Sequence, residues 1–283
     1  MDKIVQKLVK VSRKIYNEDF GVCYNPDFIA LGSVVKDFLN PDMILIGESD
    51  TKAGDILENI HLETVDNNPN INRMSHHNAE LTKIALNSYC TLKITFANVI
   101  AEICENMPGG NAHLVTNALG SDSRIGLKYL KPGLSYGGPC FPRDNRAFIN
   151  SANRFGTENT FAEVTDKLNN YQKNHRMPEL IYKVLTKKDV KEIAILGVTY
   201  KQDTTLVEES AVIAIIKSII RRNIKVFIYD PAGMEEAKTE LADYSNINFV
   251  DSIEKCVSNK SVCFIGAPWD EFYNNFSKNI LSV

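Results

Sequence analysis

The pattern that most constrains this fold is one long helical run through residues 78–106. Apolar side chains recur along it at three- and four-residue spacing. A helix of about 29 residues is about 43 Å long, and a helix of that length usually crosses a domain boundary or a subunit interface. We therefore expect it to dominate a central helical domain at 73–178, with shorter helices near 112–119, 144–154 and 160–171.

Strands and helices alternate in the last third of the chain. Buried-type strands are expected near 192–197, 225–230, 248–250 and 261–266, with helices over 210–222 and 235–241 between them. This spacing predicts a parallel, doubly wound sheet, which we assign to a C-terminal Rossmann-like domain at 179–283.

The first 72 residues alternate in the same way over a shorter span. Helices are expected over 4–16, 34–39 and 52–65 and short strands over 21–24 and 43–46, followed by a loop at 67–70. These strands are too few for a sheet of their own. The predicted fold class is therefore α/β, with a partial N-terminal βα segment (1–72), a central all-helical domain (73–178) and the C-terminal sheet domain (179–283).

The composition is that of an ordinary globular protein and excludes several classes. A net charge of −3 gives no field for nucleic acid or acidic lipid, and the apolar runs are far shorter than a membrane span. The six cysteines form no Cys-x-x-Cys pair, so a reducing cytoplasm is expected. His76-His77 has no cysteine or carboxylate at metal-ligand spacing, and we expect a solvated helix start without a metal role.

The turn Gly137-Gly138-Pro139-Cys140-Phe141-Pro142-Arg143-Asp144 places one thiol between a glycine pair and a proline. The glycines would allow a ligand to approach the backbone closely, and Pro142 is suited to open a helix. Cys140 would then lie at a helix N-terminus, where the helix dipole and Arg143 favour a thiolate. Taken alone, the turn fits a buried structural cysteine equally well.

Two further segments could bind an anion. Lys83 and Asn87 lie four residues apart on one helical face, where an ammonium and an amide could bind an oxyanion. Glu80 shares that face, so a surface ion pair is the favoured alternative. Residues 122–133 carry three cations and an aromatic ring ahead of Cys140, which suits a phosphate- or carboxylate-bearing ligand; the alternative is a solvated loop.

The usual dinucleotide fingerprint, Gly-x-Gly-x-x-Gly, does not occur in this sequence. In the predicted C-terminal sheet, Gly197 ends one strand and Asp230 ends the next. Doubly wound sheets bind nucleotides at such strand ends, so we expect a nucleotide there. The glycine pattern is too thin to select a dinucleotide.

Five blocks, in order along the chain, resemble the UDP-glucose/GDP-mannose dehydrogenase family. They are Asn25-Pro26-Asp27-Phe28, the helix from Glu80 to Asn87, the loop from Asp122 to Lys131, the turn from Gly137 to Asp144, and Ile195 to Ser210 with Tyr229-Asp230-Pro231. The resemblance covers essentially the whole chain. The Arg124-Ile125-Gly126 form is closest to the UDP-glucose 6-dehydrogenase branch.

The resemblance implies oxidation of UDP-glucose to UDP-glucuronate by two hydride transfers to NAD through a cysteine thioester. Cys140 would be the nucleophile, Lys83 and Asn87 would stabilise oxyanions, and Asp144 would move protons and assist thioester hydrolysis. The long helix would form the core of a homodimer. The substrate-binding residues it implies are Asp27, Arg124, Tyr129, Leu130, Lys131, Gly137 and Lys201, and the cofactor-binding residues are Gly138 and Arg143.

Four departures from the family pattern change these expectations. The glycine-rich phosphate turn, ribose-binding acid and active-site Thr of the NAD-binding domain are missing, and the chain stops before the family's last strand. Leu31 and Asp27 each stand where the family pattern has a glutamate. Glu208 stands where the pattern has an arginine that reaches the NAD phosphates. We therefore expect a chain that binds UDP-sugar, lacks most of the NAD-binding domain and does not turn over alone. The alternatives are a non-catalytic UDP-sugar-binding or dimerising partner of a full-length dehydrogenase, and a gene fragment without function.

Overall fold

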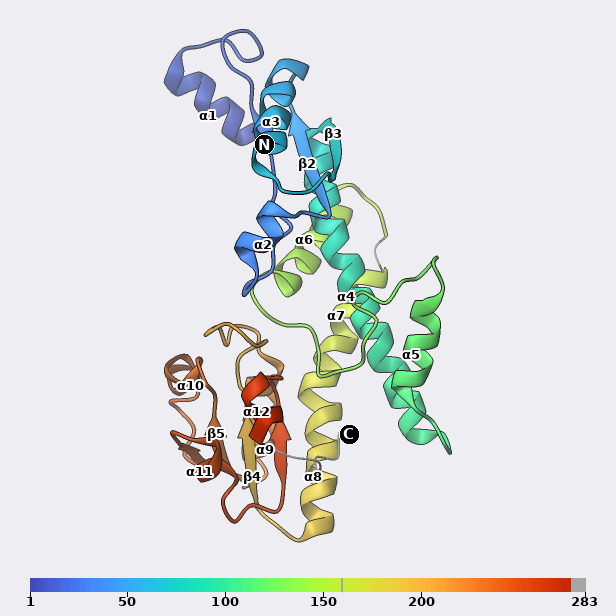
Figure 1. Cartoon of the computed structure of the whole chain (residues 1–283), viewed down its shortest axis with the longest axis vertical. Helices are drawn as coiled ribbons and strands as arrows, with labels where there is room; N and C mark the ends of the chain where they lie inside the picture. The colour runs from blue at the N-terminus through green and yellow to red at the C-terminus, as the bar shows by residue number, and fades with distance from the viewer. Residues whose placement is uncertain (159, 276–283) are drawn as a thin grey trace. The chain divides into compact units, whose positions relative to one another are not determined.

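The computed structural model describes residues 1–158 and 160–275 (Figure 1). It divides into two compact units, Met1–Leu86 and Asn87–Val283, and the long helix α4 (His76–Asn106) contributes residues to both. The predicted division into three domains, with boundaries near residues 72 and 178, stays a prediction.

The first unit is built on a small mixed sheet. Its strands are β1 (Cys23–Tyr24), β2 (Met43–Glu48) and β3 (Asn70–Ser75), and its further helices are α1 (Asp2–Ser12), α2 (Val34–Leu39) and α3 (Thr51–Thr64). β2 pairs with β1 antiparallel and with β3 parallel, with Ile44 opposite Ile71. Its buried apolar side chains are few within the described residues: Ile44, Leu45, Ile46, Ala79.

Three expectations for this unit were wrong. Its strands do make a sheet of their own, because β3 forms over residues 70–75, where no strand was predicted. α1 ends at Ser12 rather than near residue 16, because Arg13 takes a left-handed conformation at φ 57°. His76 starts α4 but is buried, and its Nε2 lies 2.7 Å from the Val22 carbonyl oxygen, so it is not solvated.

The helical part of the second unit surrounds the remainder of α4. Its elements are α5 (Ala112–Ser121), α6 (Phe141–Arg154), α7 (Thr160–Tyr171), the π-helix η1 (Gln172–Arg176) and α8 (Met177–Lys188). Figure 1 shows α7, η1 and α8 following one another as one continuous rod. The sequence pattern predicted α5, α6 and α7 but not α8, which begins with Pro178 in its first turn.

By length and composition alone, α4 is the single helix of the described residues that could cross a membrane, at a mean hydropathy of 1.2. Core helices of water-soluble proteins pass the same test. α4 also buries the polar side chains of Asn87, Ser88, Thr91 and Asn98.

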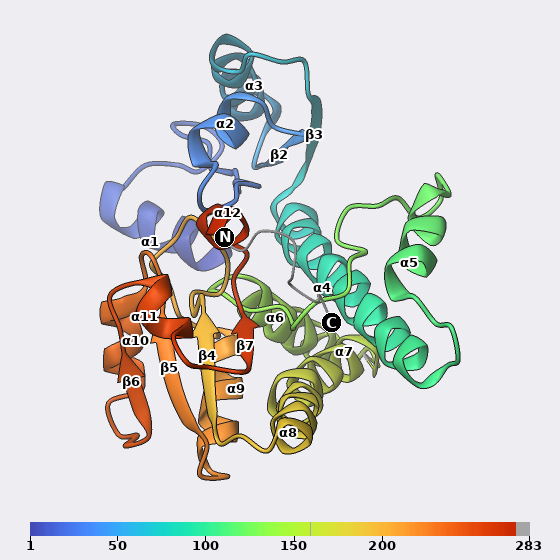
Figure 2. The same ribbon diagram turned by 60° about the horizontal axis from the view of Figure 1, so that its bottom comes forward.

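The rest of the second unit is the doubly wound sheet that the sequence predicts. Its described strands are β4 (Glu192–Leu196), β5 (Lys225–Tyr229), β6 (Ile247–Phe249) and β7 (Cys263–Ile265), all parallel in the order β6-β5-β4-β7 (Figure 2). The connecting helices are α9 (Ala211–Ile220), α10 (Met234–Glu240) and α11 (Ile253–Val257), and α12 (Asp270–Asn275) follows β7.

Alternate residues of β4 face opposite sides of this sheet. Ile193 and Ile195 pack in the cluster that contains the apolar residues of α8, α9 and α10, whereas Ala194 and Leu196 pack with residues of α11 and α12. Because side chains alternate along a strand, a buried two-sided strand must be apolar throughout. The chain order reverses between β4 and β7, so the loop after β4 lies at the switch point of the sheet.

Candidate active site

Cys140 caps the N-terminus of α6. It precedes the first helical residue, its carbonyl oxygen accepts the Asp144 N–H at 2.8 Å, and Pro142 lies in the first turn. The thiol is exposed. The predicted helix N-terminus is therefore confirmed, and the alternative of a buried structural cysteine is wrong.

A buried carboxylate lies one turn further into α6. Asp144 is 5% exposed, and it accepts hydrogen bonds from Asn87 Nδ2 at 2.6 Å and from Arg143 Nε at 2.9 Å. The hydrogen bond to Asp144 raises the pKa of Arg143, with a smaller contribution from nearby Cys140. The structure thus brings together four of the predicted residues, Asn87, Cys140, Arg143 and Asp144, within the second unit.

The glycine pair before Cys140 packs on the loop that follows β4. A methyl group on Gly138 would lie 2.5 Å from the Tyr200 ring, and one on Gly137 would lie 2.4 Å from the Glu209 carbonyl oxygen. Gly138 also donates its N–H to the Glu208 carbonyl oxygen at 3.1 Å. The glycines therefore serve close packing of the turn against the sheet domain.

Tyr200 connects this loop to the thiol. Burial raises the pKa of Tyr200, and the proximity of Cys140 raises it further. The Nζ of Lys201, a predicted substrate residue, lies 6.0 Å from the centre of the Tyr200 ring. The switch-point loop of the sheet and the cysteine turn thus form one surface.

The cationic loop before the turn is bound to α4 by a lysine side chain. Lys93 Nζ donates to the carbonyl oxygens of Ile125 and Gly126, at 3.0 Å each. Arg124 and Lys131 are exposed, and Arg124 pairs with Asp122 at 2.7 Å. Cations that face solvent are available to an anionic ligand.

The two residues between these cations differ in exposure. Tyr129 is exposed, and its ring meets that of Phe141 edge-on, with the ring centres 5.8 Å apart. Leu130 is buried. A ligand at this loop could therefore contact Leu130 through its backbone only.

Two predicted site residues, Asp27 and Lys83, lie in the first unit. Lys83 Nζ donates to the Asp27 carbonyl oxygen at 2.6 Å and lies 4.4 Å from the centre of the Phe28 ring. This contact ties α4 to the Asn25–Phe28 block. Lys83 lies one turn before Asn87 along α4.

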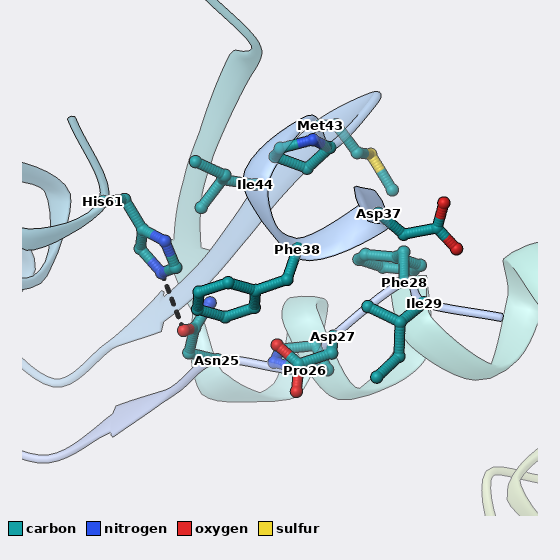
Figure 3. A pocket seen from close by; sticks show the side chains of 11 residues that line it. Asn25, Pro26, Asp27, Phe28, Ile29, Asp37, Phe38, Met43, Ile44 and His61 are labelled. Atoms are coloured by element: carbon teal, nitrogen blue, oxygen red, sulfur yellow. Dashed lines mark hydrogen bonds between the residues drawn. The ribbon is translucent and has the colours of Figure 1, made fainter. Parts of the chain in front are cut away.

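A pocket in the first unit adjoins this block (Figure 3). His61 Nε2 lies 2.8 Å from Asn25 Oδ1, and Phe28 and Phe38 supply aromatic walls. Burial lowers the pKa of His61, partly offset by the charge of Asp27. The sequence carried no signal for His61, because its partner Asn25 is 36 residues away.

Asp230 follows β5 at the strand ends where the sequence predicts a nucleotide, and that nucleotide site stays a prediction. The side chain is 2% exposed, and it accepts the N–H groups of Val198 at 2.6 Å, Ala232 at 2.9 Å and Gly233 at 2.7 Å. It therefore shapes the strand-end loops. The space beside Gly197, which has a φ of 83°, is occupied by protein atoms, since an added methyl would lie 2.7 Å from the Ala267 nitrogen.

Comparison with known proteins identifies the family. Three domain models match in order: the NAD binding domain at residues 1–65, the central domain at 77–171 and the UDP binding domain at 194–281. The chain belongs to the UDP-glucose/GDP-mannose dehydrogenase family. Members of this family are nucleotide-sugar oxidoreductases that use NAD.

Individual relatives agree with this membership. The chain is 33% identical over 257 residues to the UDP-glucose 6-dehydrogenase of Rickettsia felis, covering 89% of this chain and 56% of that protein. It is 31% identical over 277 residues to UDP-glucose 6-dehydrogenase AglM of Haloferax volcanii, covering 96% and 62%. The chain thus spans about three fifths of the length of the curated relatives it matches.

Solved structures share the fold. A UDP-glucose dehydrogenase from Pyrobaculum islandicum has a TM-score of 0.80 at 30% identity, covering 89% of this chain and 57% of that one. A UDP-D-ManNAc dehydrogenase from Pyrococcus horikoshii also has a TM-score of 0.80, at 22% identity, with coverages of 98% and 61%.

An acidic side chain stands where the family pattern has an arginine that reaches the NAD phosphates. In the loop after β4, the exposed Glu208 carboxylate would repel a phosphate.

No group of three metal-ligating side chains gathers anywhere in residues 1–158 and 160–275.

Proposed function

We propose that this chain binds a UDP-sugar and presents the Cys140 thiol to the C6 carbon of the sugar, as a nucleotide-sugar dehydrogenase of the UDP-glucose branch. One observation carries the proposal: the exposed thiol at the start of α6 directly follows a turn that packs on the loop after the first strand of the domain matched as UDP binding. Sheets of this type bind ligands at that loop.

The step that needs only this chain's residues is addition of the thiolate to a C6 aldehyde. A bond forms between Cys140 Sγ and C6, and the carbonyl electron pair moves to oxygen, giving a thiohemiacetal after protonation. Asn87 has a second amide N–H beyond the one bound to Asp144, and we assign it with Lys83 to the oxyanion. Asp144 is the proposed proton carrier.

Oxidation at C6 also needs a hydride acceptor. Because the Glu208 carboxylate would repel the NAD diphosphate, we propose no step through the cofactor. We expect the purified chain to bind UDP-glucose and to form no NADH from it.

The test uses the purified chain with UDP-glucose and its 6-aldehyde. Calorimetry should detect UDP-glucose binding, and the aldehyde should slow alkylation of Cys140 by iodoacetamide, read peptide by peptide by mass spectrometry. A Cys140→Ser variant should still bind UDP-glucose, which separates binding from the thiol chemistry. Absence of UDP-glucose binding would refute the proposal, and NADH formation would refute the expected lack of turnover.

A non-catalytic UDP-sugar-binding module is the second candidate, and Glu208 favours it. This exposed carboxylate stands at the position where the family pattern has an arginine. A binding module predicts UDP-glucose binding by calorimetry without protection of Cys140 by the aldehyde. It also predicts no activity when a separate NAD-binding domain is added.

We further propose that the chain is a cytoplasmic homodimer that pairs through α4. Tyr89, Phe96 and Ile103 are spaced seven residues apart on this helix and are 57%, 48% and 54% exposed. An apolar stripe at that spacing is typical of a helix that packs on another helix. Light scattering should give a dimer for the wild type and a monomer for Phe96→Asp; a monomeric wild type would refute the pairing.

A further inference from the structure

The segment that leads to Cys140, residues 133–138, is held by side-chain amides rather than by a neighbouring strand. The Gly133 N–H donates to Asn98 Oδ1 at 2.8 Å, and the Gly133 carbonyl accepts from Gln172 Nε2 at 2.9 Å. Asn98 lies on α4 and Gln172 on η1. Both backbone groups of this glycine are therefore satisfied by helices distant in sequence.

Asn169 does the same for Tyr136. Its Oδ1 accepts the Tyr136 N–H at 2.9 Å, and its Nδ2 donates to the Tyr136 carbonyl at 3.0 Å. One amide thus reproduces the two-way exchange that a paired strand residue makes. Asn169 is 3% exposed and Tyr136 is also 3% exposed, so water does not compete for these bonds.

This double hydrogen bond lies close to the thiol along the chain. Gly137, Gly138 and Pro139 alone separate Tyr136 from Cys140. Glycines are the least restricted residues, and here they are required by the close packing on Tyr200 and Glu209. A turn that must contain two glycines needs an anchor immediately before them to have one conformation.

We propose that Asn169 is a positioning residue for Cys140. By holding both backbone groups of Tyr136, it keeps the glycine turn in the conformation that places the thiol at the N-terminus of α6. Gln172 and Asn98 fix the backbone of Gly133 in the same way, through its carbonyl and its N–H. The inference rests on the proposed role of Cys140 as the nucleophile.

The test compares Asn169→Ala and Asn169→Asp with Lys167→Ala, a control that removes an exposed side chain from the same helix, α7. The rate of Cys140 alkylation by iodoacetamide is measured peptide by peptide against pH, with glutathione as the rate standard. Labelling of buried Cys90, Cys104 and Cys256 in the same samples reports general loosening.

Asn169→Ala should slow Cys140 alkylation about 2–5-fold at neutral pH, the range in which a helix N-terminus favours an anion. The loss should be confined to Cys140, because the buried cysteines report on the rest of the fold. Asn169→Asp should lose as much, because a carboxylate accepts the Tyr136 N–H but cannot donate to the carbonyl. Lys167→Ala should leave the rate unchanged.

Two results would overturn the inference: an unchanged Cys140 rate in both Asn169 variants, or a rise in labelling of the buried cysteines that parallels the loss at Cys140. Should Asn169→Ala fail to fold, Gln172→Ala releases the Gly133 end with the same expected sign. UDP-glucose calorimetry on the wild type is run alongside. Its failure would refute the proposed function, while the alkylation rates would still decide the positioning role.

Discussion

Gly138 is the position where a single methyl group should be most revealing. Its φ is +76°, in the left-handed region, and an added Cβ would lie 2.5, 2.7 and 2.9 Å from three atoms of the Tyr200 ring. Gly138→Ala therefore adds backbone strain and steric overlap at the contact that joins the cysteine turn to the sheet domain.

The expected loss of stability is the sum of these two effects. A left-handed conformation costs an L-residue about 1–2 kcal/mol, and overpacking by a methyl costs about 1–3 kcal/mol. Gly138→Ala should therefore lower the free energy of unfolding by about 2–5 kcal/mol. With a urea dependence near 2 kcal/mol per molar, the midpoint should fall by about 1–2.5 M.

The assay is urea unfolding followed by the fluorescence of Trp269, the single tryptophan in the sequence, which lies in the second unit. Gly133→Ala is the matched control. An added methyl there meets nothing within 4 Å and the φ is not left-handed, so its effect should stay below about 1 kcal/mol.

A double variant separates the two effects. In a Tyr200→Ala background the ring is gone, so Gly138→Ala should cost only the backbone strain of about 1–2 kcal/mol. The reasoning would be refuted if Gly138→Ala and Gly133→Ala lost equal stability, or if removal of the ring left the cost of Gly138→Ala unchanged.

Three further predictions concern buried polar groups of the second unit. Burial, the largest single effect, would raise the pKa of Glu209, but the hydrogen bonds and charges of Lys173 and Arg146 together outweigh it and lower the pKa. A carboxylate whose pKa is lowered by folding stabilises the fold at pH values above its ordinary pKa, near 4.3 for Glu, and this stabilisation is lost as the pH falls through its pKa in the folded protein. The difference in free energy of unfolding between wild type and Glu209→Gln, from urea midpoints, should therefore shrink as the pH falls below about 4. Asn87→Leu should cost about 1–3 kcal/mol, because it removes the amide donor of the buried Asp144 carboxylate; a thermal melt unchanged by the substitution would contradict this. Burial raises the pKa of Cys256 to about 11, so its alkylation at neutral pH should begin only when urea unfolds the second unit, and rapid labelling of the native protein would count against its buried position.

The sequence predicted the elements whose own pattern determines them. β4 is apolar throughout because both of its faces are covered, and α4 repeats its apolar residues over many turns. β3 was missed because Asn70-Ile71-Asn72-Arg73-Met74-Ser75 shows no such pattern. Its Arg73 pairs with Glu48, Asp55 and Glu58 from other elements, and those contacts exist only after folding.

The same distinction applies to the candidate site. The residues of the cysteine turn are adjacent in sequence, so its glycines, prolines and cysteine predict a structure together. The hydrogen bonds that fix the backbone before that turn could not be predicted, because Asn169 is 33 residues from Tyr136 and Gln172 is 39 residues from Gly133. An isolated asparagine in a helical pattern carries no sign of which backbone it will bind.

The π-helix η1 determines where the α7–α8 rod can change length. In a regular α-helix, one added or deleted residue turns everything beyond it by about 100°. A π-turn accommodates one extra residue locally, so the flanking helices keep their faces. A one-residue deletion within 172–176 should therefore leave Ile181 and Leu185 of α8 directed at the sheet. What it would disturb is the register of Gln172 and Lys173, the side chains that reach Gly133 and Glu209.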